Sequence, residues 1–152
     1  MYTISKIKTF IGRDGYGLNA TICRAGKPIC FVLDEGCGGE VRFDFRNYKQ
    51  ALTRNEAAQA EARLGEYCLS LLAVDERGTA RSAIETWVNT TVDAHQNDKR
   101  FNRIAKTKTL FRLKADPASD WRTMPGPCSP AIQAYLAKTY PNQIDKIWGV
   151  QL

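Results

Sequence analysis

The N-terminal part of the chain alternates between apolar and polar side chains. Three stretches alternate in this way and are rich in β-branched and aromatic residues: 17–23, 30–34 and 40–45. Successive side chains of a strand point to opposite faces of its sheet, so each stretch predicts a strand with one buried face. With a less decisive strand over 3–11, they predict a four-stranded antiparallel meander.

A two-residue turn at Ala25-Gly26 is expected between the second and third strands. This turn predicts three cross-strand pairs on one face: Ile22 with Ile29, Ala20 with Phe31, and Leu18 with Leu33. In the fourth strand the alternation separates two sets of side chains: Val41, Phe43 and Phe45 on one face, and Arg42, Asp44 and Arg46 on the other.

Helical periodicity follows. Thr53 and Glu56 fit a capping box, and the apolar residues behind it recur at helical spacing up to Leu71, with Gly78 ending the segment. Ser82 and Glu85 fit a second capping box. Behind this one, a single stripe carries Ile84, Trp87, Val88, Thr91 and His95.

The C-terminal part predicts a β-hairpin and a last helix. Residues 108–114 form one strand, and residues 120–124 form its partner after a turn at Asp116-Pro117. Ser129 caps a helix with Pro130 in its first position, and residues 143–152 are interpreted as a short tail.

These elements predict an α+β fold and a single domain over residues 1–152. The expected order is the meander, two central helices, the C-terminal β-hairpin and the final helix. The residues expected in its core are Phe31, Leu33, Phe43, Leu64, Leu71, Ile84 and Val88.

The second helix changes character after His95. At 100° per residue, Lys99, Arg103 and Lys106 fall on the same side as Ile84 and Val88, so an apolar face becomes cationic. Either the helix breaks near Asn97-Asp98, or it continues beyond the core into water. Both alternatives present the basic residues to solvent.

Charge is unevenly distributed along the chain. The net charge is +6, and residues 77–152 carry twelve basic and six acidic residues whereas residues 1–76 are balanced. The stretch 99–114 has seven basic residues, no acidic residue and two phenylalanines. Such a bias concerns partners rather than the fold. It also excludes an acidic mimic of DNA.

Eight residues form the predicted partner-binding surface: Lys99, Arg100, Arg103, Lys106, Lys108, Arg112, Lys114 and Arg122. Phe101, Phe111 and Trp121 accompany them. The alternative interpretation is a solvated helix face followed by an edge strand, which Lys and Arg protect from aggregation. No zinc-finger, RNA-recognition or basic-zipper pattern is present in the sequence.

The five cysteines predict free thiols, because their number is odd and no export signal precedes them. Their spacing lacks the close pairs of a zinc site, so no metal and no cofactor are expected. Cys128 precedes a helix and would need His95, the only histidine, as its base, but His95 fits a hydrogen-bonded core position. No catalytic residue is therefore predicted. The glycine-rich segments 12–17 and 35–39 are interpreted as turns between strands.

The composition is that of a soluble protein, with 43% hydrophobic and 25% charged residues. No apolar run reaches the roughly 20 residues that a membrane crossing needs. We therefore expect a cytoplasmic protein that does not associate with membranes.

Two stretches resemble a known group. Residues 12–45 resemble the opening of small uncharacterised proteins encoded by tailed phages and mobile elements of proteobacteria, and residues 108–124 with 129–141 resemble their C-terminal part. The resemblance implies an accessory protein in the host bacterial cytoplasm. Such proteins often block host machinery, including defence systems such as CRISPR effectors. The resemblance supplies no catalytic or binding residue.

Three hypotheses follow. The first is a non-enzymatic interaction protein whose basic surface binds a host nucleoprotein or acidic protein, with inhibition of a defence complex as the sharpest version. The second is a direct, non-specific binder of DNA or RNA. The third is a small cysteine-dependent hydrolase or transferase.

Overall fold

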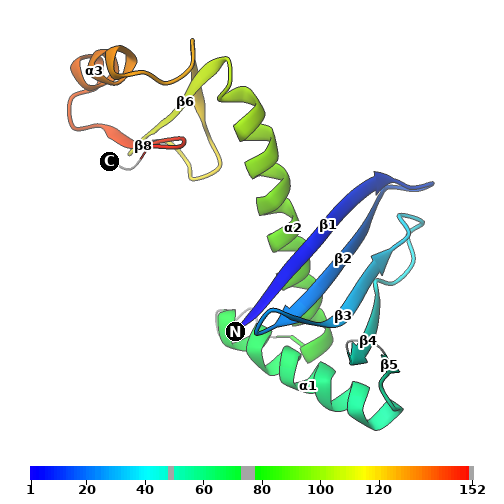
Figure 1. Cartoon of the computed structure of the whole chain (residues 1–152). Coiled ribbons are helices and arrows are strands. Elements are labelled where there is room, and N and C mark those ends of the chain that lie inside the picture. The colour runs from blue at the N-terminus through cyan, green and yellow to red at the C-terminus, as the bar shows by residue number, and fades with distance from the viewer. Residues whose placement is uncertain (48–49, 73–77, 151–152) are drawn as a thin grey trace. The chain divides into compact units, whose positions relative to one another are not determined.

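The computed structural model describes residues 1–47, 50–72 and 78–150 and confirms the α+β class. The first seven elements are β1 (Tyr2–Ile11), β2 (Tyr16–Arg24), β3 (Lys27–Asp34), β4 (Arg42–Asn47), β5 (Gln50–Ala51), α1 (Arg54–Leu71) and α2 (Ala80–Ile104). The last four are β6 (Lys108–Leu113), β7 (Arg122–Pro125), α3 (Pro130–Thr139) and β8 (Ile144–Ile147). Figure 1 shows them in chain order from blue to red.

The chain forms two compact units, Met1–Asp93 and Ala94–Leu152, and α2 continues from the first into the second. Each unit has its own cluster of buried apolar residues. The sequence predicts one shared core within a single domain, whereas the described residues build two separate clusters. The boundary falls between Asp93 and Ala94, within α2. The apolar stripe of this helix lies in its N-terminal part, and the helix continues beyond that stripe.

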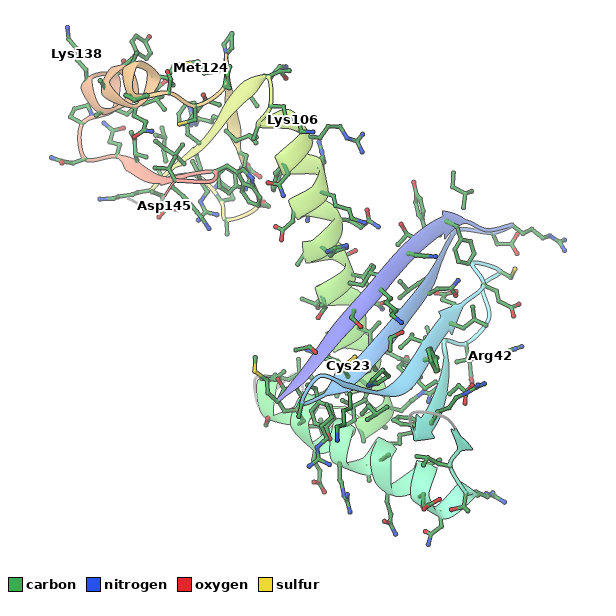
Figure 2. All side chains as sticks on the ribbon, in the orientation of Figure 1. Cys23, Arg42, Lys106, Met124, Lys138 and Asp145 are labelled. Atoms are coloured by element: carbon green, nitrogen blue, oxygen red, sulfur yellow. The ribbon has the colours of Figure 1, made fainter. Side chains whose placement is uncertain are left out.

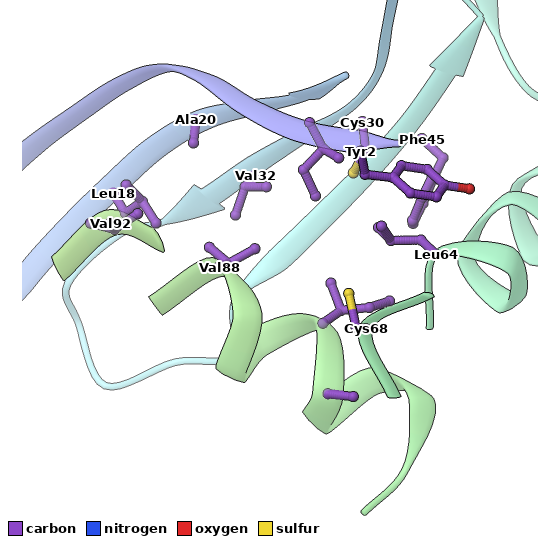
Figure 3. Packing of buried hydrophobic residues seen from close by; sticks show 13 residues of the cluster. Tyr2, Leu18, Ala20, Cys30, Val32, Phe45, Leu64, Cys68, Val88 and Val92 are labelled. Atoms are coloured by element: carbon purple, nitrogen blue, oxygen red, sulfur yellow. The ribbon is translucent and has the colours of Figure 1, made fainter. Parts of the chain in front are cut away.

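The N-terminal unit is an antiparallel sheet with two helices on one face (Figure 1). The strand order is β1-β2-β3-β4-β5, so the predicted meander is confirmed and gains a short fifth strand. Figure 3 shows Val32 of the sheet facing Val88 of α2, and Leu64 of α1 belongs to the same cluster. All three side chains are at most 2% exposed.

The β2–β3 turn is confirmed, but the predicted register is wrong. Ala25 and Gly26 both have positive φ, which is the backbone that a tight two-residue hairpin turn needs. A bulge between Ile22 and Cys23 then shifts the pairing by one residue, so that Ile22 lies opposite Cys30. The remaining predicted pairs shift likewise: Ala20 lies opposite Val32, and Leu18 opposite Asp34. A one-residue shift exchanges the two faces of a strand.

This shift decides which β3 side chains are buried. Phe31 is 43% exposed and Leu33 is only half-buried, whereas Cys30 and Val32 are in the core. The prediction for Phe31 is therefore wrong. The alternation in β4 agrees with the structure, since Phe45 is buried and its exposed neighbours are Arg42, Asp44 and Arg46.

The helices bear out most of the predicted core. Leu64, Ile84 and Val88 are fully buried, and Phe43 is half-buried against the Arg81 guanidinium, which lies 4.2 Å from its ring centre. Leu71 is 54% exposed, so its predicted burial is wrong. It is the last residue of α1, and the next residue, Leu72, has an extended backbone. The predicted continuation of the segment to Gly78 crosses residues 73–77, which lie outside the described part.

The two predicted helix caps have different outcomes. The capping box of Thr53 and Glu56 is present at the start of α1. The second box is misplaced by three residues, because α2 begins at Ala80 and the Thr79 hydroxyl accepts the Ser82 N–H at 3.1 Å. Glu85 accepts instead from the Arg81 guanidinium, at 3.1 Å.

The C-terminal unit is a three-stranded antiparallel sheet in the order β7-β6-β8, with α3 against it. The predicted hairpin of β6 and β7 and the Ser129 cap of α3 are both confirmed. The predicted tail contributes β8, and its last two residues, Gln151 and Leu152, lie outside the described part. Because β8 pairs with β6, the interpretation of β6 as an edge strand is wrong.

Candidate functional site

The two units differ in net charge. The N-terminal unit carries twelve basic and twelve acidic residues, and the C-terminal unit ten basic and four acidic residues. The whole net charge of +6 therefore belongs to the C-terminal unit. This division is sharper than the difference between the two halves of the sequence.

The basic residues begin on the last turns of α2. The helix is unbroken across Asn97 and Asp98 and ends at Ile104, so it continues beyond the apolar stripe as one of the two alternatives predicts. Lys99 and Arg103 lie one turn apart on one face. Lys106 follows in the turn after α2, where Figure 2 labels it.

Seven of the eight predicted partner-binding residues are exposed, and Arg112 is half-buried. Apart from Arg122, the exposed residues are Lys99, Arg100, Arg103, Lys106, Lys108 and Lys114. Within residues 94–150, all of which the structure describes, none of these six forms an ion pair. The predicted exposure of these six side chains is confirmed, and their role in partner binding remains a prediction. Their charges are available to an anionic partner.

Arg112 is engaged within the unit. Its Nε donates to the Asp145 carboxylate at 2.7 Å, and its Nη1 donates to the Ala118 carbonyl at 2.6 Å. Asp145 belongs to β8 and is labelled in Figure 2. The guanidinium also lies 5.5 Å from the ring centre of Trp121. Arg112 therefore connects the central strand to β8 and to the loop before β7.

Arg122 is engaged as well. Its Nε and Nη2 donate to the two carboxylate oxygens of Asp116 at 2.8 and 2.7 Å. The Leu113 N–H donates to the same carboxylate at 3.0 Å. These hydrogen bonds, with Arg122 contributing most, lower the pKa of Asp116 to about 2. Arg112 and Arg122 are thus structural ion-pair partners rather than free cations.

Three aromatic side chains gather beside the basic residues. Phe101 of α2, Trp121 and Trp148 form a mutual contact in which all three ring-centre distances are between 5.0 and 5.5 Å. The Trp148 indole N–H donates to Oδ1 of Asn102 at 3.0 Å, and its backbone N–H donates to the Leu110 carbonyl. The cluster therefore connects α2, the loop before β7 and the residue after β8.

A surface pocket of about 780 Å³ adjoins this cluster. Its apolar wall is formed by Phe101, Ile104, Leu110, Ala118 and Trp121. Its polar groups come from Asn97, Arg100, Asp116, Ser119, Asp120, Arg122 and Thr123. Two of the predicted basic residues, Arg100 and Arg122, thus lie at this pocket, and only Arg100 is free of an ion pair there.

Most of the pocket lining, and Trp148 of the adjoining aromatic cluster, were not predicted from the sequence. Trp148 lies in the stretch interpreted as a tail, although Ile144, Ile147 and Val150 give that stretch regularly placed apolar residues. These residues recur every third position, whereas a strand alternates every second one, so their spacing does not indicate a third strand. Asn97 and Asp120 gave no signal, because polar residues in helices and turns are common.

The five cysteines are free thiols in the structure. Burial raises the pKa of Cys30 to about 12 and that of Cys68 to about 11. Cys128 accepts a hydrogen bond from the Gln133 amide at 3.6 Å and, within the described residues, shares none with the half-buried His95. Across residues 1–47, 50–72 and 78–150, no group of three His, Cys, Asp or Glu side chains is placed to hold a metal ion.

No protein-family model, curated protein or solved structure matches the chain. Among the described helices, none combines the length and apolar character that a membrane crossing requires.

Proposed function

We propose that the C-terminal unit is a non-catalytic module that binds nucleic acid, either free or within a nucleoprotein. One observation carries this proposal: six exposed cations that form no ion pair with any described residue lie within residues 99–114, in the unit that holds the entire net charge. Lys and Arg that contact phosphates release counterions, which supplies most of the affinity of non-specific binding.

A second basic surface, formed by Arg42 and Arg46 on β4, is less available. In the N-terminal unit, Arg42 lies 3.6 Å from a Glu35 carboxylate oxygen, and Arg46 donates to Asp44 at 2.7 Å. Both arginines therefore have acidic neighbours on the exposed face of the sheet. Phosphate binding there would have to compete with these carboxylates, which is not the case for Lys99 or Arg103.

The proposal is tested by fluorescence anisotropy of the full chain with labelled 20-nucleotide DNA and RNA, in single-stranded and duplex form. Poly-glutamate serves as an acidic polypeptide with the same sign of charge. We expect at least one nucleic acid to bind and to be displaced far better by unlabelled nucleic acid than by poly-glutamate. Binding of poly-glutamate alone would support an acidic protein as the partner instead.

The resemblance to phage-encoded proteins leads to a narrower proposal, in which the partner is a nucleoprotein complex of host defence such as a CRISPR effector. A basic module would bind the nucleic acid path of such a complex. We expect added protein to slow target cleavage by a purified effector, and a variant without the basic residues to have no effect.

A further inference from the structure

We propose that the pocket beside the aromatic cluster takes an unpaired nucleobase, which makes the module selective for single strands. This inference rests on the proposed nucleic-acid binding and names the form of nucleic acid that is bound. The pocket belongs entirely to the C-terminal unit and adjoins Arg100, one of the free cations.

The lining suits a base. Phe101 and Trp121 line the pocket with aromatic side chains, and aromatic platforms stack on any base because every base has a π-face. Asn97 and Thr123 add polar groups of the kind that read base edges. A volume of about 780 Å³ lies in the range of small-molecule sites, so a base with its sugar would fit.

Charge decides which part of a nucleotide enters. The carboxylates of Asp116 and Asp120 both line the pocket. Asp116 is paired with Arg122, whereas Asp120 accepts only a hydroxyl hydrogen bond, from Ser119 at 2.8 Å, among the described residues. An ionised Asp120 repels phosphate, so the backbone stays on the free cations and the neutral base enters. Its carboxylate also favours bases with an exocyclic amino group, which donates a hydrogen bond.

The platform is held in place by the fold. The Trp121 ring contacts Phe101, Trp148 and the Arg112 guanidinium, each at about 5.5 Å between centres. Trp148 is itself tied to Asn102 through its indole N–H. A platform fixed before binding loses little conformational freedom when a base stacks on it. A duplex cannot use it without breaking a pair, because its bases are stacked and paired.

The first experiment changes the nucleic acid and leaves the protein intact. The full chain is titrated with a 12-nucleotide oligodeoxycytidine, with an abasic 12-mer of the same phosphate number, and with a blunt duplex. We expect the abasic strand and the duplex to bind at least about tenfold more weakly, since stacking of one base accounts for such a factor. Only the oligodeoxycytidine should quench tryptophan fluorescence.

Equal affinity for the normal and abasic strands, with no quenching, would overturn the inference while leaving the proposed function in place. Absence of binding to all three would overturn both. These two failures are therefore distinguishable.

The second experiment uses variants that keep the aromatic cluster. Asp120→Asn is compared with Asp98→Asn, an exposed aspartate outside the pocket, so both remove one negative charge from the same unit. We expect wild type and Asp98→Asn to prefer oligodeoxycytidine over oligodeoxythymidine, and Asp120→Asn to lose that preference. An unchanged preference in Asp120→Asn would contradict the assigned role of its carboxylate.

Discussion

Arg122 and Asp116 form two parallel hydrogen bonds. Because the two charges are paired, Arg122 is not a free cation of the predicted basic surface, and Asp116 is not a free carboxylate in the pocket. A forked arginine–carboxylate pair is stronger and more directional than a lysine contact. The Asp116 side chain is 11% exposed and that of Arg122 is 50% exposed, so the carboxylate is the sheltered partner. The pair closes the segment between β6 and β7.

This pair predicts an acid-sensitive C-terminal unit. The folded pKa of Asp116 is about 2 and its ordinary value is 3.8, so the pair stabilises the fold fully above that ordinary value. The stabilisation is lost as the pH falls towards 2, because the carboxylate must then be protonated. We expect Asp116→Asn to lower the free energy of unfolding at pH 6 and to lower it much less at pH 2.5.

Urea unfolding followed by tryptophan fluorescence at both pH values provides the measurement. Asp98→Asn serves as the control, because Asp98 is exposed and forms no ion pair among the described residues. An equal loss from Asp116→Asn at pH 6 and pH 2.5 would show that the ion pair does not stabilise the unit.

A second prediction concerns the start of α2. Because the Thr79 hydroxyl accepts the Ser82 N–H, Thr79→Ala removes an N-cap and is expected to cost about 1 kcal/mol. Ser82→Ala keeps that backbone donor and is expected to cost under about 0.5 kcal/mol. Urea unfolding of both variants measures the difference. A larger loss from Ser82→Ala would place the cap at Ser82 after all.

A third prediction separates the buried from the exposed apolar residues of the N-terminal unit. Ile84 is 0% exposed, so Ile84→Ala should cost roughly 2–5 kcal/mol through lost burial and the cavity left behind. Leu71 is 54% exposed, and Leu71→Ala should cost less than about 1 kcal/mol. Comparable losses in the two variants would mean that Leu71 is part of the core.

Much of the fold follows from local patterns. Alternation predicts β2, β3 and β4, and the cap signals predict where α1 and α3 begin, because these features depend on neighbouring residues alone. The register of β3 was predicted wrongly because one bulged residue moves the side chains of a strand to the opposite faces of the sheet. The alternation of apolar and polar residues does not indicate the bulge between Ile22 and Cys23. The same shift in register explains why Phe31 was wrongly predicted to be buried.

The site was predictable only in part. The run of Lys and Arg after His95 is visible in the sequence, and six of its residues are exposed as expected. The pairing of Arg112 with Asp145 joins residues far apart in the chain, and so does the contact of Phe101 with Trp148. Such pairs depend on which strands adjoin in the sheet, and β8 was not predicted.

A fourth prediction concerns the thiols. Cys37 is exposed, whereas Cys30 and Cys68 are buried with pKa values raised to about 12 and 11. Since the thiolate is the reactive form, Cys37 should react first with a disulfide reagent at pH 8, and Cys30 and Cys68 only on unfolding. Cys37→Ser should remove the fast phase. A fast phase that persists in this variant would contradict the assignment.

The most direct test of the central claim is the salt dependence of single-strand binding. With about four phosphate contacts, the slope of log affinity against log salt is expected near −2.8 for the wild type. Arg103→Glu, Lys106→Glu and Lys108→Glu combined should bring it close to −0.7. The matched control combines Lys8→Glu, Arg13→Glu and Lys27→Glu, three exposed residues of the N-terminal unit. Both triple variants have a net charge of zero, since each replaces three basic residues by acidic ones in a chain of +6. If the C-terminal basic residues bind the phosphates, the control keeps a slope near −2.8; equal slopes in the two triple variants would contradict this assignment.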